Sequence, residues 1–257
     1  MICVGVDVGT RFIKTCLLNG GQLIADDCVR MGLRFDGIVK DSLDKVLRSA
    51  GISRRKIEKT AATGYGARHV KKVDLCLPSS ACVAAGAHAL MPEVRSVVDV
   101  GGLFISVASL DAAGRVQETA LVEKCATGSG RLLEVVTEAL GLSFEQIQSE
   151  LQKSKDPLPM ANQCAVFAES NVISMINQGQ KPADVVAGVL VSIAQKSATL
   201  LRGLRAPLPY AVTGGVSALP AFVEMLSLEL DKQVSTFPLG SRLLGAYGAA
   251  VLAGAER

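Results

Sequence analysis

The sequence predicts an α/β protein of two similar lobes around a cleft, and two observations carry that prediction. First, the chain contains an internal repeat, in which Val4 aligns with Ser96 and Lys14 with Ser106, an offset of 92 residues. Second, each strand-rich copy is followed by segments with helical spacing of apolar residues, a succession typical of α/β proteins. We expect residues 1–92 together with 241–257 to form the first lobe and residues 93–240 the second.

The elements follow from the repeat and from the apolar spacing. Each copy predicts a strand that ends in Asp-Val-Gly, a second strand, a polar turn and a third strand. Gly51, Gly141 and Pro92 mark ends of helical segments. The expected helices span residues 39–50, 79–90, 130–140, 144–151, 165–176, 182–204, 218–230 and 243–255. Residues 153–162, which include two prolines, read as a loop.

Composition excludes several classes of protein. The 257 residues are 49% hydrophobic, and 27 basic against 24 acidic residues give a net charge of +3. A nucleic-acid binder needs a basic face and stacking aromatic residues, which scattered charges, no Trp and three Tyr do not provide. No uncharged apolar run is as long as a membrane span, and Met1 is not followed by a secretory signal. We therefore expect a cytoplasmic protein without a membrane or nucleic-acid partner.

The glycine turns of the repeat suit a nucleotide's phosphates. A glycine lets backbone N–H groups approach a phosphate closely, and an Asp at the strand end can hold hydrated Mg²⁺. A third glycine element follows a strand at residues 212–216 and suits the phosphate or adenosine side of a nucleotide. The candidates are Asp7, Gly9, Thr10 and Lys14 in the first turn, Asp99, Gly101 and Gly102 in the second, and Gly214 and Gly215 in the third.

Two of the seven cysteines stand just before expected helices. Cys125 and Cys164 would have their sulfur atoms near helix N-termini, where the helix dipole stabilises a thiolate or an anionic metal cluster. Two thiolates are half the ligands of a four-iron cluster, and a twofold dimer could supply the other half. From the residues alone, two buried thiols are the simpler interpretation. Cysteines 3, 16 and 28 fall in strands, where we expect core residues.

The order of the three glycine elements resembles that of the superfamily of actin, sugar kinases and the large heat-shock ATPases. More specifically, residues 124–133 and 164–173 resemble the cysteine segments of the 2-hydroxyacyl-CoA dehydratase activators and of the related ATPase subunits of benzoyl-CoA reductases. Residues 62–66 (ATGYG) resemble a further element of that family. The match spans nearly the whole chain, and it implies the actin-like ATPase (ribonuclease H-like) fold.

The resemblance also implies cofactors and partners. Cys125 and Cys164 would be ligands of one [4Fe-4S] cluster per dimer, and the glycine turns would bind ATP or ADP with Mg²⁺. ATP hydrolysis would drive low-potential electrons from a ferredoxin or flavodoxin to an iron–sulfur acyl-CoA dehydratase or aromatic acyl-CoA reductase. The dimer would contain two copies of this chain or one copy with a related subunit.

One departure from the family pattern keeps alternatives open. After Gly102 the family usually has Gln-Asp near the γ-phosphate, whereas this chain has Leu103 and Phe104. The chain could therefore be a nucleotide-binding, weakly hydrolysing subunit of a heterodimeric reductase. A small-molecule kinase on the same fold is the other alternative, although no Asp or Glu follows Gly102 where a kinase needs its base.

Overall fold

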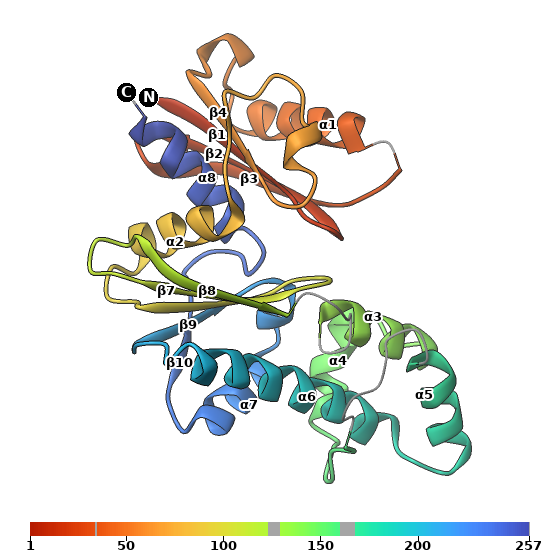
Figure 1. The fold of residues 1–257 in the computed structure, drawn as a ribbon. Coiled ribbons are helices and arrows are strands. Elements are labelled where there is room, and N and C mark those ends of the chain that lie inside the picture. Colours follow the sequence, from red (N-terminus) through yellow and green to blue (C-terminus); the bar gives the residue numbers. More distant parts are fainter. Residues whose placement is uncertain (34, 123–128, 160–167, 257) are drawn as a thin grey trace. The chain divides into compact units, whose positions relative to one another are not determined.

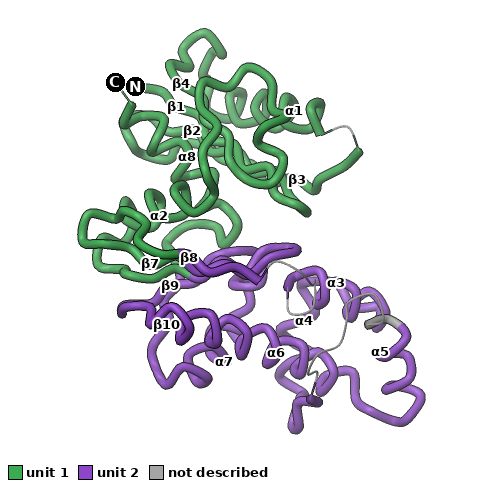
Figure 2. Tube along the Cα trace, in the orientation of Figure 1, with its two compact units in different colours: residues 1–97, 108–118, 237–257 green, residues 98–107, 119–236 purple. Residues whose placement is uncertain are grey.

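The computed structural model describes residues 1–33, 35–122, 129–159 and 168–256. The chain divides into two compact units (Figure 2). Unit 1 contains residues 1–97, 108–118 and 237–257, and unit 2 contains residues 98–107 and 119–236. The C-terminal helix thus belongs to the same unit as the first strand, and both chain ends lie there (Figure 1).

The first sheet has the strand order β3-β2-β1-β4-β5, with β4 parallel to β1 and the first three strands antiparallel. Its strands are β1 (Ile2–Val8), β2 (Phe12–Asn19), β3 (Gln22–Arg30), β4 (Lys59–Thr63) and β5 (Leu75–Cys76). The associated helices are α1 (Phe35–Ser49), α2 (Ser79–Leu90) and α8 (Leu244–Ala255), with short 3-10 turns η1 (Arg54–Lys56) and η2 (Ala67–His69).

Alternation along the strands explains why helices pack on both faces of this sheet. Leu17 points into a cluster with α1, whereas its neighbours Cys16 and Leu18 point into a cluster with α8. Side chains of successive strand residues point to opposite faces, so β2 is buried on both. Backbones approach closely on the α8 side, because a Cβ on Gly5 would overlap the carbonyl group of Ala246.

The second sheet repeats the order of the first, as β10-β9-β6-β7-β8. Its strands are β6 (Ser96–Val100), β7 (Ile105–Leu110), β8 (Val116–Val122), β9 (Tyr210–Thr213) and β10 (Val234–Thr236). The remaining helices are α3 (Gly130–Ala139), α4 (Phe144–Leu151), α5 (Ala168–Asn177), α6 (Pro182–Gly203) and α7 (Pro220–Leu230), with the 3-10 turn η3 (Gly215–Ala218). The shared order supports the duplication that the sequence repeat indicates.

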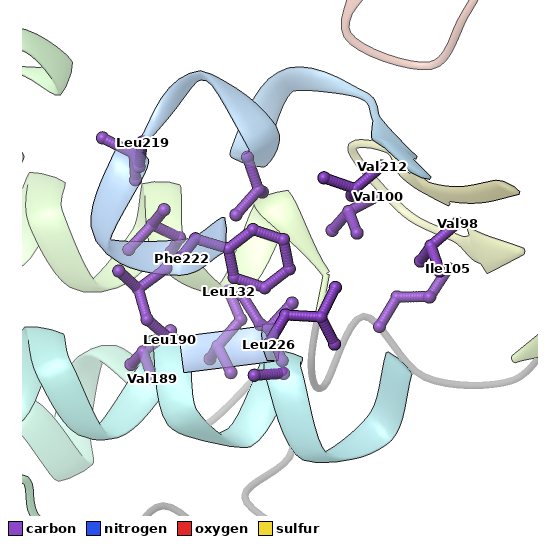
Figure 3. Packing of buried hydrophobic residues seen from close by; sticks show 14 of the residues in the cluster. Val98, Val100, Ile105, Leu132, Val189, Leu190, Val212, Leu219, Phe222 and Leu226 are labelled. Carbon is purple, nitrogen blue, oxygen red and sulfur yellow. The ribbon is translucent and has the colours of Figure 1, made fainter. Parts of the chain in front are cut away.

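The largest hydrophobic core lies in unit 2 (Figure 3). Phe222 and Leu226 of α7 pack with Leu190 of α6 and Leu132 of α3, and all four are fully buried. Helix α6 is long and apolar enough to cross a membrane by length and composition, but 72% of its most apolar stretch is buried in the protein. Its burial identifies α6 as a helix of this core.

The eight predicted helices are all present, with ends that differ by a few residues. Helices α2 and α4 have the predicted bounds, and α1 begins four residues earlier than expected, at Phe35. One expectation about the strands was wrong: Cys3 and Cys16 are buried, but Cys28 is exposed. The reason is topological, because β3 is the edge strand of its sheet.

Candidate functional site

The first glycine turn joins β1 to β2 and brings together the residues that the sequence singles out in this unit. The Gly9 N–H donates to the Phe12 carbonyl oxygen at 3.0 Å and closes the turn, with Thr10 inside it. Lys14 on β2 lies opposite Asp7 on β1, and its Nζ donates to Asp7 Oδ2 at 2.7 Å. Their side chains are 12% and 17% exposed, so this ion pair is largely removed from solvent.

Two further glycines surround the Asp7 carboxylate. Gly64 directly follows β4, and a Cβ there would overlap Asp7 Oδ1 and lie 2.6 Å from the Val8 carbonyl oxygen. Gly245, in the first turn of α8, is close enough that a Cβ would lie 3.1 Å from Asp7 Oδ2. A side chain at Gly64 would overlap the backbone of Val8, and one at Gly245 would be in tight contact with the Asp7 carboxylate, so both glycines let β4 and α8 lie close to that carboxylate.

The second glycine turn has the same backbone geometry as the first. The Gly101 N–H donates to the Phe104 carbonyl oxygen at 2.9 Å, which is the bond of the first turn shifted by 92 residues. Asp99, two residues earlier on β6, lies against Gly214, where a Cβ would be 2.6 Å from Asp99 Oδ1. Unit 2 thus brings Asp99, the second turn and the third glycine element together.

Gly64 and Gly214 occupy equivalent places in the two units. Both follow a strand that ends in Thr and have positive φ, +89° and +94°. Each carbonyl oxygen then accepts a bond from the residue three positions on, Ala67 at 3.2 Å and Ser217 at 3.1 Å. Gly64 is not among the residues predicted for the site, although the shared Thr-Gly after each strand is the signal that reveals it.

Side chains distinguish the two turns. At the offset of the repeat, Arg11 corresponds to Leu103 and Lys14 to Ser106. The first turn therefore has two cationic side chains at positions where the second has an apolar and a hydroxyl side chain. Leu103 is 37% exposed at its turn and gives no polar side-chain atom there.

The second turn is bonded directly to the start of α3. The Gly130 N–H donates to the Gly101 carbonyl oxygen at 3.0 Å, and the Arg131 N–H donates to that of Gly102 at 2.8 Å. The first N–H groups of a helix have no partner within it, so these bonds satisfy them. Gly215, the last of the predicted glycines, begins η3 directly after Gly214.

The predicted cluster ligands, Cys125 and Cys164, lie outside the described residues. Helix α3 begins five residues after Cys125, and α5 begins four residues after Cys164. Over the residues that the structure describes, no group of three or more His, Cys, Asp or Glu residues could hold a metal ion. The carboxylates of Asp7 and Asp99 nevertheless suit Mg²⁺, which prefers oxygen ligands and binds through one or two carboxylates and substrate phosphates.

Known proteins are similar to this chain in both sequence and fold. The family model described as the BadF/BadG/BcrA/BcrD ATPase family matches residues 4–253. The 2-hydroxyisocaproyl-CoA dehydratase activator of Clostridioides difficile is 30% identical over 98% of this chain and 95% of its own length. A benzoyl-CoA reductase subunit of Thauera aromatica is 29% identical over 97% of this chain and 92% of its own.

A solved structure confirms the predicted actin-like fold. The activator of the 2-hydroxyisocaproyl-CoA dehydratase from Clostridium difficile with bound ADPNP superposes with a TM-score of 0.93. The alignment covers 100% of this chain and 95% of the activator, with 30% of residues identical. Family model, relatives and fold agree, and the chain belongs to the BadF/BadG/BcrA/BcrD ATPase family.

Proposed function

We propose that this protein is an ATP-dependent activator or reductase component that delivers low-potential electrons to an acyl-CoA dehydratase or an aromatic acyl-CoA reductase. ATP or ADP with Mg²⁺ would be the bound nucleotide; the residues proposed to hold it are Asp7, Gly9, Thr10 and Lys14 in unit 1, and Asp99, Gly101, Gly102, Gly214 and Gly215 in unit 2. Cys125 and Cys164 bind a [4Fe-4S] cluster that two subunits share, in a homodimer or a heterodimer. A bound cluster of this kind stores and transfers single electrons.

One observation carries the nucleotide part of the proposal. In each unit the next-to-last residue of a strand is an Asp that lies against a positive-φ glycine, and the strand continues into a turn closed by the same backbone bond. Backbone N–H groups in such turns form concavities that bind anions, and the nearby carboxylates can hold the metal ion. A plain hairpin needs neither an Asp at the strand end nor a second glycine packed against it.

Backbone bonds offer a connection between the nucleotide and the cysteine segments. Helix α3 is bonded to the second turn through Gly101 and Gly102, and Cys125 precedes this helix by five residues. A nucleotide that shifts the turn therefore shifts the start of α3 as well. Interfaces with two discrete arrangements can convert such small shifts into larger movements.

Relatives supply the support for the partner. The Clostridioides difficile relative is named as a dehydratase activator and that of Thauera aromatica as a reductase subunit. We infer an iron–sulfur acyl-CoA enzyme as the electron acceptor and a reduced ferredoxin or flavodoxin as the donor, in the cytoplasm.

The second turn favours one variant of this function, a subunit that binds ATP and hydrolyses it slowly. Leu103 and Phe104 stand where the family usually has Gln and Asp, and neither can orient an attacking water molecule. A heterodimer with a better-equipped subunit would compensate for this loss. Restoring both polar residues, by Leu103→Gln with Phe104→Asp, then raises the rate of ATP hydrolysis, whereas an unchanged rate contradicts this variant.

Anaerobic purification tests the cluster. The wild-type protein should be brown, with about four irons per dimer, and the Cys125→Ala and Cys164→Ala variants should lose iron while still binding ATP. Cys76→Ala is the matched control, because Cys76 is an exposed thiol elsewhere in the chain. A colourless, iron-free wild-type protein, prepared where other clusters survive, overturns the electron-transfer proposal.

A further inference from the structure

Arg242 packs on the residue that closes the first glycine turn. It lies in the loop before α8, and its Cζ is 4.5 Å from the centroid of the Phe12 ring. The Phe12 carbonyl oxygen is the acceptor for the Gly9 N–H, so the guanidinium group lies beside this turn. Three residues later, Gly245 lies against the Asp7 carboxylate. Residues 242–245 thus contact both Phe12, at the end of the first turn, and Asp7, before it.

Arg242 and Lys14 lie on the same face of the first sheet. Phe12 and Lys14 are two residues apart on β2, so their side chains point the same way and are spaced by about 7 Å along the strand. Cys28 on β3 lies opposite Lys14, and its thiol is affected by the charges of both Lys14 and Arg242. Although the Cys28 side chain is exposed, partial desolvation by its neighbours raises the pKa of its thiol, and the charges of Arg242 and Lys14 both oppose this rise.

Arg242 would add a positive charge beside the first turn, in addition to those of Arg11 and of the Mg²⁺ ion in the proposed site. The Lys14 ammonium is bonded to Asp7, so that pair is neutral overall. A nucleoside triphosphate brings several negative charges, and the second turn has Leu103 and Ser106 where the first has Arg11 and Lys14. An arginine stacks through its face and binds phosphate oxygens through the N–H groups along its edge, so one guanidinium can do both.

We propose that Arg242 is a further phosphate ligand of the first turn, which contacts the terminal phosphates of a bound nucleoside triphosphate beside Lys14. The inference rests on the proposed ATP site, and it assigns a residue outside every glycine motif. Phe12 acts as the platform that orients the guanidinium plane, and α8 positions it. Arg242 therefore contributes to the preference for triphosphate over monophosphate.

Calorimetric titration of the full chain with ATP and AMP tests this assignment. Arg242→Met should weaken ATP binding at least about tenfold, or about 1.4 kcal/mol, and leave AMP binding unchanged. Arg54→Met is the matched control, because Arg54 is an arginine of the same unit that is ion-paired with Asp44. Equal ATP affinities of the wild type and Arg242→Met overturn the assignment of Arg242.

A variant of Phe12, the ring on which Arg242 stacks, distinguishes a phosphate contact of Arg242 from a role in packing. Phe12→Leu removes the ring but keeps the charge, so we expect a smaller loss of ATP affinity than in Arg242→Met. If Phe12→Leu lowers the affinity for ATP as much as Arg242→Met does, and lowers the affinity for AMP as well, Arg242 acts through packing and is not a phosphate ligand. Arg242→Lys, which retains charge without the planar fork, should give an intermediate affinity.

A measurement on the wild type covers the case in which Arg242→Met does not fold. Phenylglyoxal modifies accessible arginines, and mass spectrometry should show that ATP protects Arg242 more than AMP does, with Arg54 unaffected. Equal labelling of Arg242 with and without ATP overturns the inference. If the wild type binds no ATP at all, the proposed function fails, an outcome distinct from a wild type that binds ATP without the help of Arg242.

Discussion

Gly64→Ala is the sharpest test of the arrangement around Asp7. Gly64 has φ +89°, and a Cβ there would overlap the Asp7 carboxylate and approach the Val8 carbonyl oxygen. Gly21 has φ +87° with nothing within 4 Å of an added Cβ, which makes Gly21→Ala a matched control. The two glycines have nearly the same φ, so the difference between the variants reports the contacts of the added Cβ with Asp7 and Val8.

The structure sets the size of this difference. Left-handed backbone costs an L-residue about 1–2 kcal/mol, so Gly21→Ala should lower the free energy of unfolding by about that amount. Overpacking a site that cannot relax costs about 1–3 kcal/mol more. We therefore expect the free energy of unfolding of Gly64→Ala to be lower than that of Gly21→Ala by this extra amount. Changes in the unfolded chain are the same for both and cancel.

Urea unfolding followed by circular dichroism is the appropriate assay, because the chain has no Trp to serve as a fluorescent probe. A second readout is the affinity for ATP with Mg²⁺, which should fall in Gly64→Ala and stay unchanged in Gly21→Ala. If the two variants unfold at the same urea concentration and bind ATP equally, the packing of Gly64 against Asp7 is refuted.

Three further predictions follow from burial and packing. Native protein treated with iodoacetamide at pH 8 should be alkylated at the exposed Cys28 and not at Cys82, whose pKa burial raises to about 11; labelling of both contradicts this. Hydrogen bonds from Ser154 and from backbone N–H groups hold the pKa of the Asp184 carboxyl below its ordinary 3.8. The ionised carboxylate therefore stabilises the fold above that pH, and this stabilisation is lost as the pH falls through the lowered pKa. Asp184→Asn should therefore flatten the loss of stability below pH 4 in urea titrations, and an unchanged pH profile would count against it. Gly248→Ala should lower the melting temperature strongly, because a Cβ would overlap the Cys82 carbonyl group; an unchanged melting temperature would show that α2 and α8 can separate.

The sequence predicted the fold well because repeat and periodicity are local signals. The Asp-Val-Gly copies located both glycine turns, and apolar spacing located all eight helices, since each pattern depends on residues near one another in the chain. The relation of Gly64 to Asp7 depends instead on the parallel pairing of β4 with β1, over more than fifty residues. Periodicity carries no information on that pairing.

Two other features depend on tertiary structure, for different reasons. Arg242 belongs to no motif, and only the return of the chain through α8 brings it to Phe12. Cys28 reads as a core residue because it falls in a predicted strand, yet the position of β3 at the sheet edge leaves its thiol exposed. The predicted roles of Cys125 and Cys164 remain predictions, since they depend on the family resemblance.

The placement of both chain ends in unit 1 bears on how the protein is made. Residues 119–236 of unit 2 form one continuous stretch, whereas unit 1 is completed only by residues 237–257. During synthesis, at about 5–20 residues per second, the face of β1 that α8 covers stays exposed until α8 leaves the ribosome. The nascent chain is most vulnerable to aggregation on this face, and truncations within α8 should be degraded in the cell even though every glycine turn has been translated.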